Sequence, residues 1–310
     1  MTDEPVRTYL NYRPPEQCYT LQELDITYGQ AISDYAISSP FQLLSSTGIE
    51  ALKSEILAEE VQSQCKFSCE RTACCLRGVS RYCPLLKRLW SSQEVTDIVS
   101  KIAGVKLKPV MDYELGVCNI QVPDARGDDA LVDDWHTDSY PFVAIVMLSD
   151  TAGLVGGETL VKRGDGSVLP FAFPSAGSCL VMQGQHVVHC GRRMVSGPGE
   201  RVTMVTSYVP ADPCLPDRSI MKGTWRVSHR SQLYYGWAKY RFASLAAQAN
   251  ARLSALENRP EAAVEEEDVQ DIMAWLTHME DFTRKTREEM LSCEAAYGQL
   301  KSAQAVSQQA

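Results

Sequence analysis

The chain has no long apolar run, and no stretch approaches the ~20 consecutive apolar residues that cross a bilayer. Its first residues, 1–5, are polar and acidic, so we expect no secretory signal peptide and a cytoplasmic location. A surplus of basic residues is also missing, because 39 acidic and 30 basic side chains give a formal net charge of −9. Broad electrostatic attraction to nucleic acid or to an anionic membrane is therefore not expected.

Paired cysteine motifs are missing as well. The eleven cysteines are an odd number, which argues against a complete set of disulfides. Five of them fall between Cys65 and Cys83, but their spacing lacks the short paired motifs of a structural zinc site, and no histidine lies nearby. We interpret them as reduced thiols, with a zinc site as the alternative.

The composition is that of a globular protein, with 45% hydrophobic and 22% charged residues among 310. At roughly 150 residues per domain, this length predicts about two domains or one large one. We expect one integrated unit made of three regions: an N-terminal arm with supporting helices over 1–105, a β-rich core over 106–210 and a helical extension over 211–310. No internal repeat is found.

Hydrophobic periodicity divides the chain into helical and strand-rich parts. Residues 1–40 have no clear period and are expected to form an irregular arm, and the tail 302–310 is expected to be frayed. Short strand-like runs punctuated by glycine and proline predict a sandwich or barrel in the core. The expected strands are 117–122, 142–148, 158–161, 178–182 and 202–209. The expected helices are 46–59, 83–89, 92–103 and an antiparallel pair, 228–256 and 265–299.

His136 and Asp138 are two residues apart in a strand-like region. On an extended strand such residues face the same side, about 6–7 Å apart at their Cα atoms, close enough to bind one metal ion. A histidine on a later strand would complete a facial triad of two histidines and one carboxylate, which suits Fe(II). His186 and His189 are the candidates. We choose His189, because it ends a short apolar run, whereas His186 directly follows a turn.

Arg201 and Thr203 form a second pair on a predicted strand. A buried arginine needs an anion, and the planar guanidinium suits a carboxylate. Thr203 faces the same side and adds a hydroxyl to the same anion. The sequence therefore predicts a metal site and a carboxylate anchor in one cavity.

These motifs together resemble the Fe(II)/2-oxoglutarate-dependent oxygenase family. The resemblance extends over about residues 75–245 and includes the stretches 111–121, 135–140 and 156–159, which look like fungal natural-product oxygenases of that family. It implies a double-stranded β-helix (a jelly roll, cupin-like) with N-terminal helices and a C-terminal helical pair. It also implies Fe(II) on His136, Asp138 and His189, and 2-oxoglutarate held by Arg201 and Thr203.

The implied reaction consumes O2 and decarboxylates 2-oxoglutarate to succinate, with ascorbate helpful in vitro. Hydroxylation of a small molecule is the default outcome, and desaturation or cyclisation are variants. Asp138 disfavours halogenation, since related halogenases have a small residue there. The expected substrate is an amino acid or a natural-product intermediate of secondary metabolism. A 2-oxoglutarate-independent metal dioxygenase and a non-catalytic jelly-roll binder are the alternatives.

Further polar and aromatic residues are candidates for the cavity. Three have polar ends that would reach 2-oxoglutarate or substrate, with structural hydrogen bonding as the alternative: Tyr113, Asn119 and Gln121. Three are candidate substrate contacts, with core packing or a surface turn as the alternative: Trp135, Tyr140 and Arg192. We expect no nucleic-acid or membrane partner, and a homodimer through the C-terminal helices is an open possibility.

Overall fold

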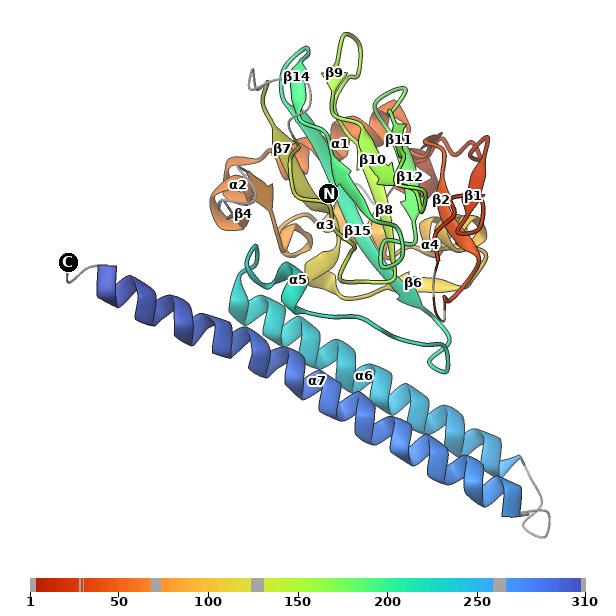
Figure 1. Ribbon diagram of the computed structural model, residues 1–310. Coiled ribbons are helices and arrows are strands. Elements are labelled where there is room, and N and C mark those ends of the chain that lie inside the picture. Colours follow the sequence, from red (N-terminus) through yellow and green to blue (C-terminus); the bar gives the residue numbers. More distant parts are fainter. Residues whose placement is uncertain are drawn as a thin grey trace.

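The computed structural model describes residues 4–27, 29, 31–67, 74–123, 131–258 and 266–307. The chain forms a β-rich body from which a long helical pair extends (Figure 1). Several short helices and strands surround the central strands. They are η1 (Val6–Tyr9), β4 (Lys66–Phe67), β5 (Cys75–Leu76), η2 (Val79–Arg81), β6 (Leu107–Pro109), η3 (Asp112–Glu114), β9 (Val155–Gly156) and β14 (Met194–Ser196).

Two facing sheets form the centre of the body. The larger sheet has the strand order β7-β15-β8-β12 at its middle, and the smaller has the order β11-β10-β13, extended by a bridge between His136 and His189. Successive segments alternate between the two sheets, which is the topology of a double-stranded β-helix. The predicted jelly roll is thus confirmed. The strands are β7 (Val117–Gln121), β8 (Phe142–Met147), β10 (Thr159–Lys162), β11 (Val168–Phe171), β12 (Ser178–Met182), β13 (His189–Gly191) and β15 (Arg201–Pro210).

Alternation along the central strands separates the two faces of the large sheet. On β15, Val202, Met204 and Tyr208 join the hydrophobic core that includes the N-terminal helices. The intervening residues Arg201 and Thr203 line a cavity between the sheets. Because side chains alternate along a strand, the same rule gives β7 and β8 one apolar face and one cavity face.

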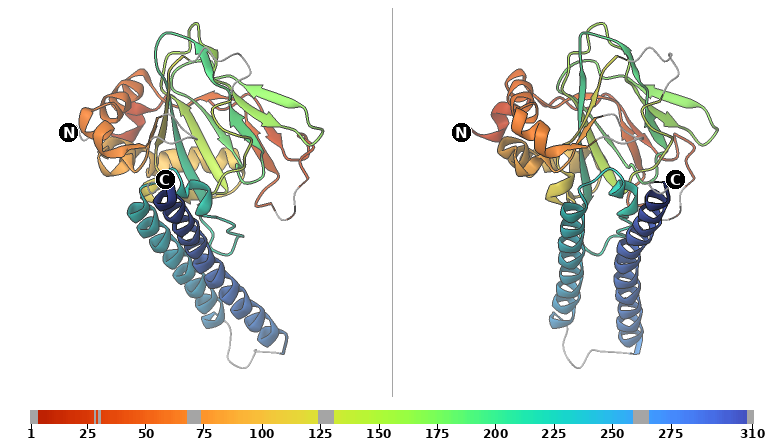
Figure 2. Two further views of the ribbon diagram at one scale, coloured as in Figure 1. Left: turned by 60° about the vertical axis from the view of Figure 1, so that its left-hand side comes forward. Right: turned by 90° about the vertical axis from the view of Figure 1, so that its left-hand side faces the viewer.

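Helices cover the outer face of the large sheet (Figure 2). The predicted helix over 92–103 is confirmed as α4 (Gln93–Ala103), whose N-terminus is capped by the Ser92 hydroxyl accepting from the Val95 amide. The helix expected over 83–89 is α3 (Pro84–Trp90). The helix expected over 46–59 is α1 (Ser46–Ile56), which begins where expected and ends three residues earlier, and a further helix, α2 (Glu59–Cys65), follows it.

The expectation of an irregular arm over 1–40 is wrong. Three short strands lie in or just after it, and two of them pair with β12 and extend the large sheet beyond its central four strands. All four residues of β2 are buried, so it shows no period of two, and β1 and β3 are only three and two residues long, so the sequence pattern did not reveal these strands. They are β1 (Cys18–Thr20), β2 (Tyr35–Ser38) and β3 (Phe41–Gln42).

The C-terminal part is helical, as expected, and its two long helices lie antiparallel in all three views (Figures 1 and 2). They are α6 (Arg230–Glu257) and α7 (Glu266–Ser307), preceded by the short α5 (Lys222–Trp225). The frayed tail expected from residue 302 is wrong up to Ser307, since α7 continues to that residue. Among the described residues, no helix combines the length and apolar character needed to cross a bilayer.

Candidate active site

Main-chain pairing brings the two predicted histidine ligands together. The His136 amide donates to the His189 carbonyl at 3.0 Å, and the His189 amide donates back at 2.9 Å. Directly paired residues on adjacent strands carry their side chains on the same side of the sheet. One ligand atom from each of His136, His189 and Asp138 lies within 4.8 Å of the others. The three residues chosen from the sequence therefore converge on one point.

Backbone carbonyls orient both imidazole rings. His136 Nδ1 lies 2.8 Å from the Asp134 carbonyl oxygen, and His189 Nδ1 lies 2.9 Å from that of Val187. A carbonyl accepts only from a protonated nitrogen, so in the neutral form of each ring Nε2 keeps its lone pair. Burial also lowers the pKa of His189, which favours the neutral imidazole. This arrangement is typical of metal-binding histidines.

The Asp138 carboxylate fits a metal ion for a separate reason. Its Oδ2 atom is buried without a hydrogen-bond partner among the described residues, and it lies 3.7 Å from His189 Nε2. Its backbone is fixed, because the Asp138 amide donates to the Gly184 carbonyl at 2.8 Å. A side chain at Gly184 would collide with this carboxylate, since a Cβ there would lie 2.0 Å from Oδ2. A buried carboxylate oxygen without a partner among the described residues, beside two imidazole rings, is a donor set that suits Fe(II).

Arg201 lies on the wall of the same cavity and is only 5% exposed. Its Nη2 donates to the Gly157 carbonyl at 2.6 Å, and Nη1 lies 3.5 Å from the Thr203 hydroxyl. Among the described residues, no carboxylate lies within ion-pair distance of this guanidinium, and its Nε has no partner. Burial lowers the pKa of Arg201 to about 10, and the Glu158 charge opposes this fall. A buried cation without a counter-ion can bind an anion there.

Asn119 and Gln121 lie beside the Arg201–Thr203 pair. In the register of β7 and β15, Gln121 is opposite Arg201 and Asn119 is opposite Thr203. Both amide side chains line the cavity, whose volume is about 240 Å³. The Gln121 carboxamide oxygen accepts from the Met194 amide at 3.3 Å, so a structural contact accounts for part of its hydrogen bonding.

The structure does not bring all of the other candidates to the cavity. Tyr140 lines it, but Tyr113, Trp135 and Arg192 are not among its lining residues. The Tyr113 hydroxyl accepts from the His229 amide at 2.7 Å, on the side of α6. Tyr113 belongs to η3 rather than to the strand that carries Asn119, because Gly116 at φ +64° interrupts the extended backbone. Arg192 lies 3.7 Å from the Glu158 carboxylate instead.

One buried ion pair on the cavity wall was missed from the sequence. Arg77 Nη2 pairs with Glu114 Oε1, and the two side chains are 5% and 3% exposed. Burial raises the pKa of Glu114, while the charge of Arg77 opposes that rise. The residues are 37 apart in the sequence and belong to no periodic pattern, so only the fold shows their pairing.

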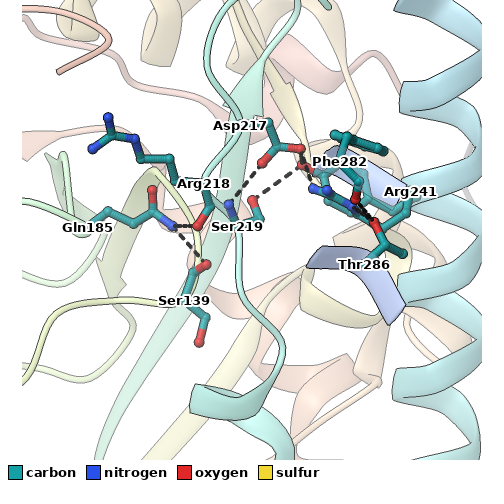
Figure 3. Close-up of polar contacts among 9 residues, drawn as sticks. Ser139, Gln185, Asp217, Arg218, Ser219, Arg241, Phe282 and Thr286 are labelled. Carbon is teal, nitrogen blue, oxygen red and sulfur yellow. Dashed lines mark hydrogen bonds and ion pairs between the residues drawn. The ribbon is translucent and has the colours of Figure 1, made fainter. Parts of the chain in front are cut away.

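Polar contacts tie the cavity wall to the C-terminal helices (Figure 3). Arg241 of α6 donates to Asp217 at 2.9 Å and to Thr286 of α7, also at 2.9 Å. Arg218 directly follows Asp217 in the chain. The side-chain amide of Gln185 donates to the Arg218 carbonyl at 2.8 Å and to the Ser139 carbonyl at 3.1 Å. Since Ser139 directly follows Asp138, the helical extension supports the segment that carries this carboxylate.

Glu289 of α7 makes a second connection to the cavity. Its Oε2 accepts from the backbone amides of Met221 and Lys222, at 2.8 and 3.0 Å, at the start of α5. Gly223 and Thr224 of α5 line the cavity. The wall at this end of the site is therefore held in place by a residue far along the C-terminal helix.

The described cysteines are free thiols, as expected from the sequence. Burial raises the pKa of Cys65 to about 11 and that of Cys83 to about 12, so these thiols are protonated and unreactive at neutral pH. Cys69 lies outside the described residues. Among the residues that are described, the cysteines do not form a group with metal-binding geometry, whereas the histidine–aspartate triad does.

No family model and no curated protein matches the chain. Among solved structures, it is similar to AviO1 from Streptomyces viridochromogenes Tue57, with 17% identity, a TM-score of 0.44, and coverage of 64% of this chain and 95% of that one. It is also similar to SnoK, a non-heme α-ketoglutarate-dependent carbocyclase from nogalamycin biosynthesis, with 16% identity, a TM-score of 0.44, and coverage of 63% of this chain and 87% of that one. A third similar structure is an oxidoreductase of the 2OG-Fe(II) oxygenase family from Burkholderia pseudomallei, with 14% identity, a TM-score of 0.41, and coverage of 56% of this chain and 82% of that one.

Proposed function

We propose that this protein is a non-haem Fe(II)- and 2-oxoglutarate-dependent oxygenase that oxidises a small molecule. One observation carries the proposal: a converging His136–Asp138–His189 triad shares a cavity with Arg201, for which the described part of the chain supplies no counter-ion. A metal dioxygenase without a 2-oxo acid co-substrate has no need of that buried cation.

The residues have separate tasks in this proposal. His136, Asp138 and His189 would hold the metal, which when bound activates O2 for attack on a substrate C–H bond. Arg201 and Thr203 would bind the far carboxylate of 2-oxoglutarate, with Asn119 and Gln121 beside them on β7. This ion pair fixes the co-substrate relative to the triad. The carbonyls that bind the histidine Nδ1 protons keep both rings in the tautomer that a metal needs.

Hydroxylation remains our default outcome, and natural-product intermediates and amino acids remain the substrate classes to test. The assay is succinate release by purified protein with Fe(II), 2-oxoglutarate, ascorbate and O2, with and without a panel of such compounds. Wild-type protein should release succinate, and His136→Ala should abolish release. Arg201→Ala should raise the KM for 2-oxoglutarate strongly. Iron binding with no response to Arg201→Ala would favour a 2-oxoglutarate-independent dioxygenase, and absence of iron binding would favour a non-catalytic binder.

A further inference from the structure

The Arg77–Glu114 ion pair lies at the end of the cavity away from Arg201. Arg201 is opposite Gln121 in the β7–β15 register, whereas Val205 is opposite Val117. Glu114 precedes Val117 by three residues, so it lies toward the Ser207 end of β15. Six residues of extended strand separate Arg201 from Ser207, which is about 20 Å. Two buried arginines thus lie toward opposite ends of one cavity, and of the two only Arg77 has a counter-ion among the residues that the structure describes.

The pair is fixed by its surroundings. The Tyr140 hydroxyl lies 3.5 Å from Glu114 Oε1, the oxygen that also accepts from Arg77 Nη2. On the other side, the Arg77 guanidinium carbon lies 5.3 Å from the centre of the Tyr113 ring. Tyr113 is in turn held by the His229 amide. The orientation of both charged groups is therefore set before any ligand arrives.

Both charged groups keep unused polar atoms, and Arg77 Nε is buried without a partner among the described residues. Within the described part of the chain, Arg77 Nη1 and Glu114 Oε2 have no hydrogen-bond partner, and both residues line the cavity. Arg77 Nη1 can only donate, and the carboxylate oxygen Glu114 Oε2 accepts. The wall therefore offers a donor and an acceptor from two directly paired side chains. A ligand group that satisfies both must itself contain an acceptor and a donor close together.

Charge decides which ligand group fits. The Arg77–Glu114 pair has no net charge, so a carboxylate placed on it would add an unbalanced negative charge to a buried site. Burying an uncompensated charge is costly, whereas a neutral polar group that makes both hydrogen bonds is not penalised in this way. A primary amide, or a cis amide such as that of a lactam, presents a carbonyl acceptor and an N–H donor on the same side.

We propose that Arg77 and Glu114 form a substrate subsite that binds a neutral amide, with the amide carbonyl accepting from Arg77 Nη1 and the amide N–H donating to Glu114 Oε2. This assignment rests on the proposed function, because it names the substrate end of the same cavity. It favours amide-containing molecules, such as cyclic dipeptides or other lactams, over free amino acids. The opposite end, at Arg201, is left for the dicarboxylate.

The test compares matched probes that differ in charge. Neutral probes are cyclic dipeptides and N-acetyl amino-acid amides, and anionic probes are the N-acetyl amino acids with the same side chains. Binding to the purified protein is measured by ligand-observed NMR and calorimetry, with 2-oxoglutarate present and absent. We expect neutral probes to bind the wild type more tightly than their anionic counterparts. In Arg77→Lys, which keeps the positive charge but loses the second amino group, neutral probes should bind about tenfold more weakly.

Glu114→Gln gives the sharper result, because it leaves Arg77 without a counter-ion. Anionic probes should then gain about tenfold in affinity, and the preference of the wild type should reverse. Asp112→Asn is the matched control, since Asp112 is in the same short helix but pairs with Lys87 at the surface. It should leave all affinities unchanged. Circular dichroism and thermal melting identify any variant that does not fold, and either substitution alone decides the question.

Two results overturn the subsite: a wild-type preference for anionic probes, or no binding of any neutral probe. An unchanged preference in folded Glu114→Gln does the same. Affinity for 2-oxoglutarate, measured in the same samples, is a separate readout. If 2-oxoglutarate binds and amides do not, the subsite is wrong and the oxygenase proposal stands. If amides bind as expected and 2-oxoglutarate does not, the oxygenase proposal fails.

Discussion

Replacement of Gly184 by alanine should remove metal binding without unfolding the protein. A Cβ at residue 184 would lie 2.0 Å from Asp138 Oδ2 and 2.7 Å from its Cγ. Cβ contacts shorter than 3.0 Å are essentially never observed, so the carboxylate must move by about 1 Å or rotate away. Bonds between metals and their ligands tolerate only about 0.2 Å, and even disturbance of groups that support a ligand costs about 10–100-fold in affinity. We therefore expect at least that loss of affinity for Gly184→Ala.

Mn(II) binding measured by electron paramagnetic resonance of the free ion gives the affinity directly, without dependence on turnover. Gly191→Ala is the matched control, because Gly191 lines the same cavity but a Cβ there would meet only the Val132 side chain, at 3.4 and 3.6 Å. This control should bind Mn(II) as the wild type does. Thermal melting of the metal-free proteins should show that both variants fold. Wild-type affinity in Gly184→Ala would refute the reasoning that Asp138 is a ligand held in this position.

Three further predictions follow from the contacts of the site and of the helical extension. Arg201→Lys should raise the KM for 2-oxoglutarate at least about tenfold in steady-state assays and leave Mn(II) affinity unchanged, because a point charge does not replace the planar guanidinium. Glu289→Ala should lower the free energy of unfolding by about 1–2 kcal/mol in denaturant titrations, because two backbone amides at the start of α5 lose their acceptor. The control Glu288→Ala removes an exposed ion pair with Arg284 and should lower the free energy of unfolding by less than about 0.5 kcal/mol. The homodimer stays a prediction: light scattering should give twice the monomer mass, and Met273→Glu, at a residue 63% exposed on α7, should halve it.

The sequence predicted the chemistry of the site because that chemistry follows a period of two. His136 and Asp138, and likewise Arg201 and Thr203, are two residues apart, so an extended backbone places each pair on one face. His189 was chosen over His186 because it ends a short apolar run, and the structure brings His189 to the triad. The helices with strong apolar periodicity, such as α4, were also predicted within one residue of their observed ends.

Contacts between distant segments could not be predicted in this way. Arg77 and Glu114 come from a short strand end and a 3-10 helix, and neither lies in a periodic pattern. Tyr113 was grouped with Asn119 and Gln121 as if the strand continued through Gly116, where the backbone turns to a positive φ. The N-terminal strands were missed for a related reason, since all four residues of β2 are buried and its pattern is uniformly apolar or small.

The order of residues along β15 explains how one cavity separates its two tasks. Arg201, Thr203, Val205 and Ser207 all line the cavity, and each step of two residues advances about 6–7 Å along the strand. The unpaired cation is at the start of this row, and the neutral Arg77–Glu114 pair lies toward its end. A dicarboxylate gains an ion pair only at the first position, because at the second its charge would be unbalanced. If both proposals hold, a counter-ion at Arg77, and none at Arg201 among the described residues, would keep co-substrate and substrate from exchanging ends.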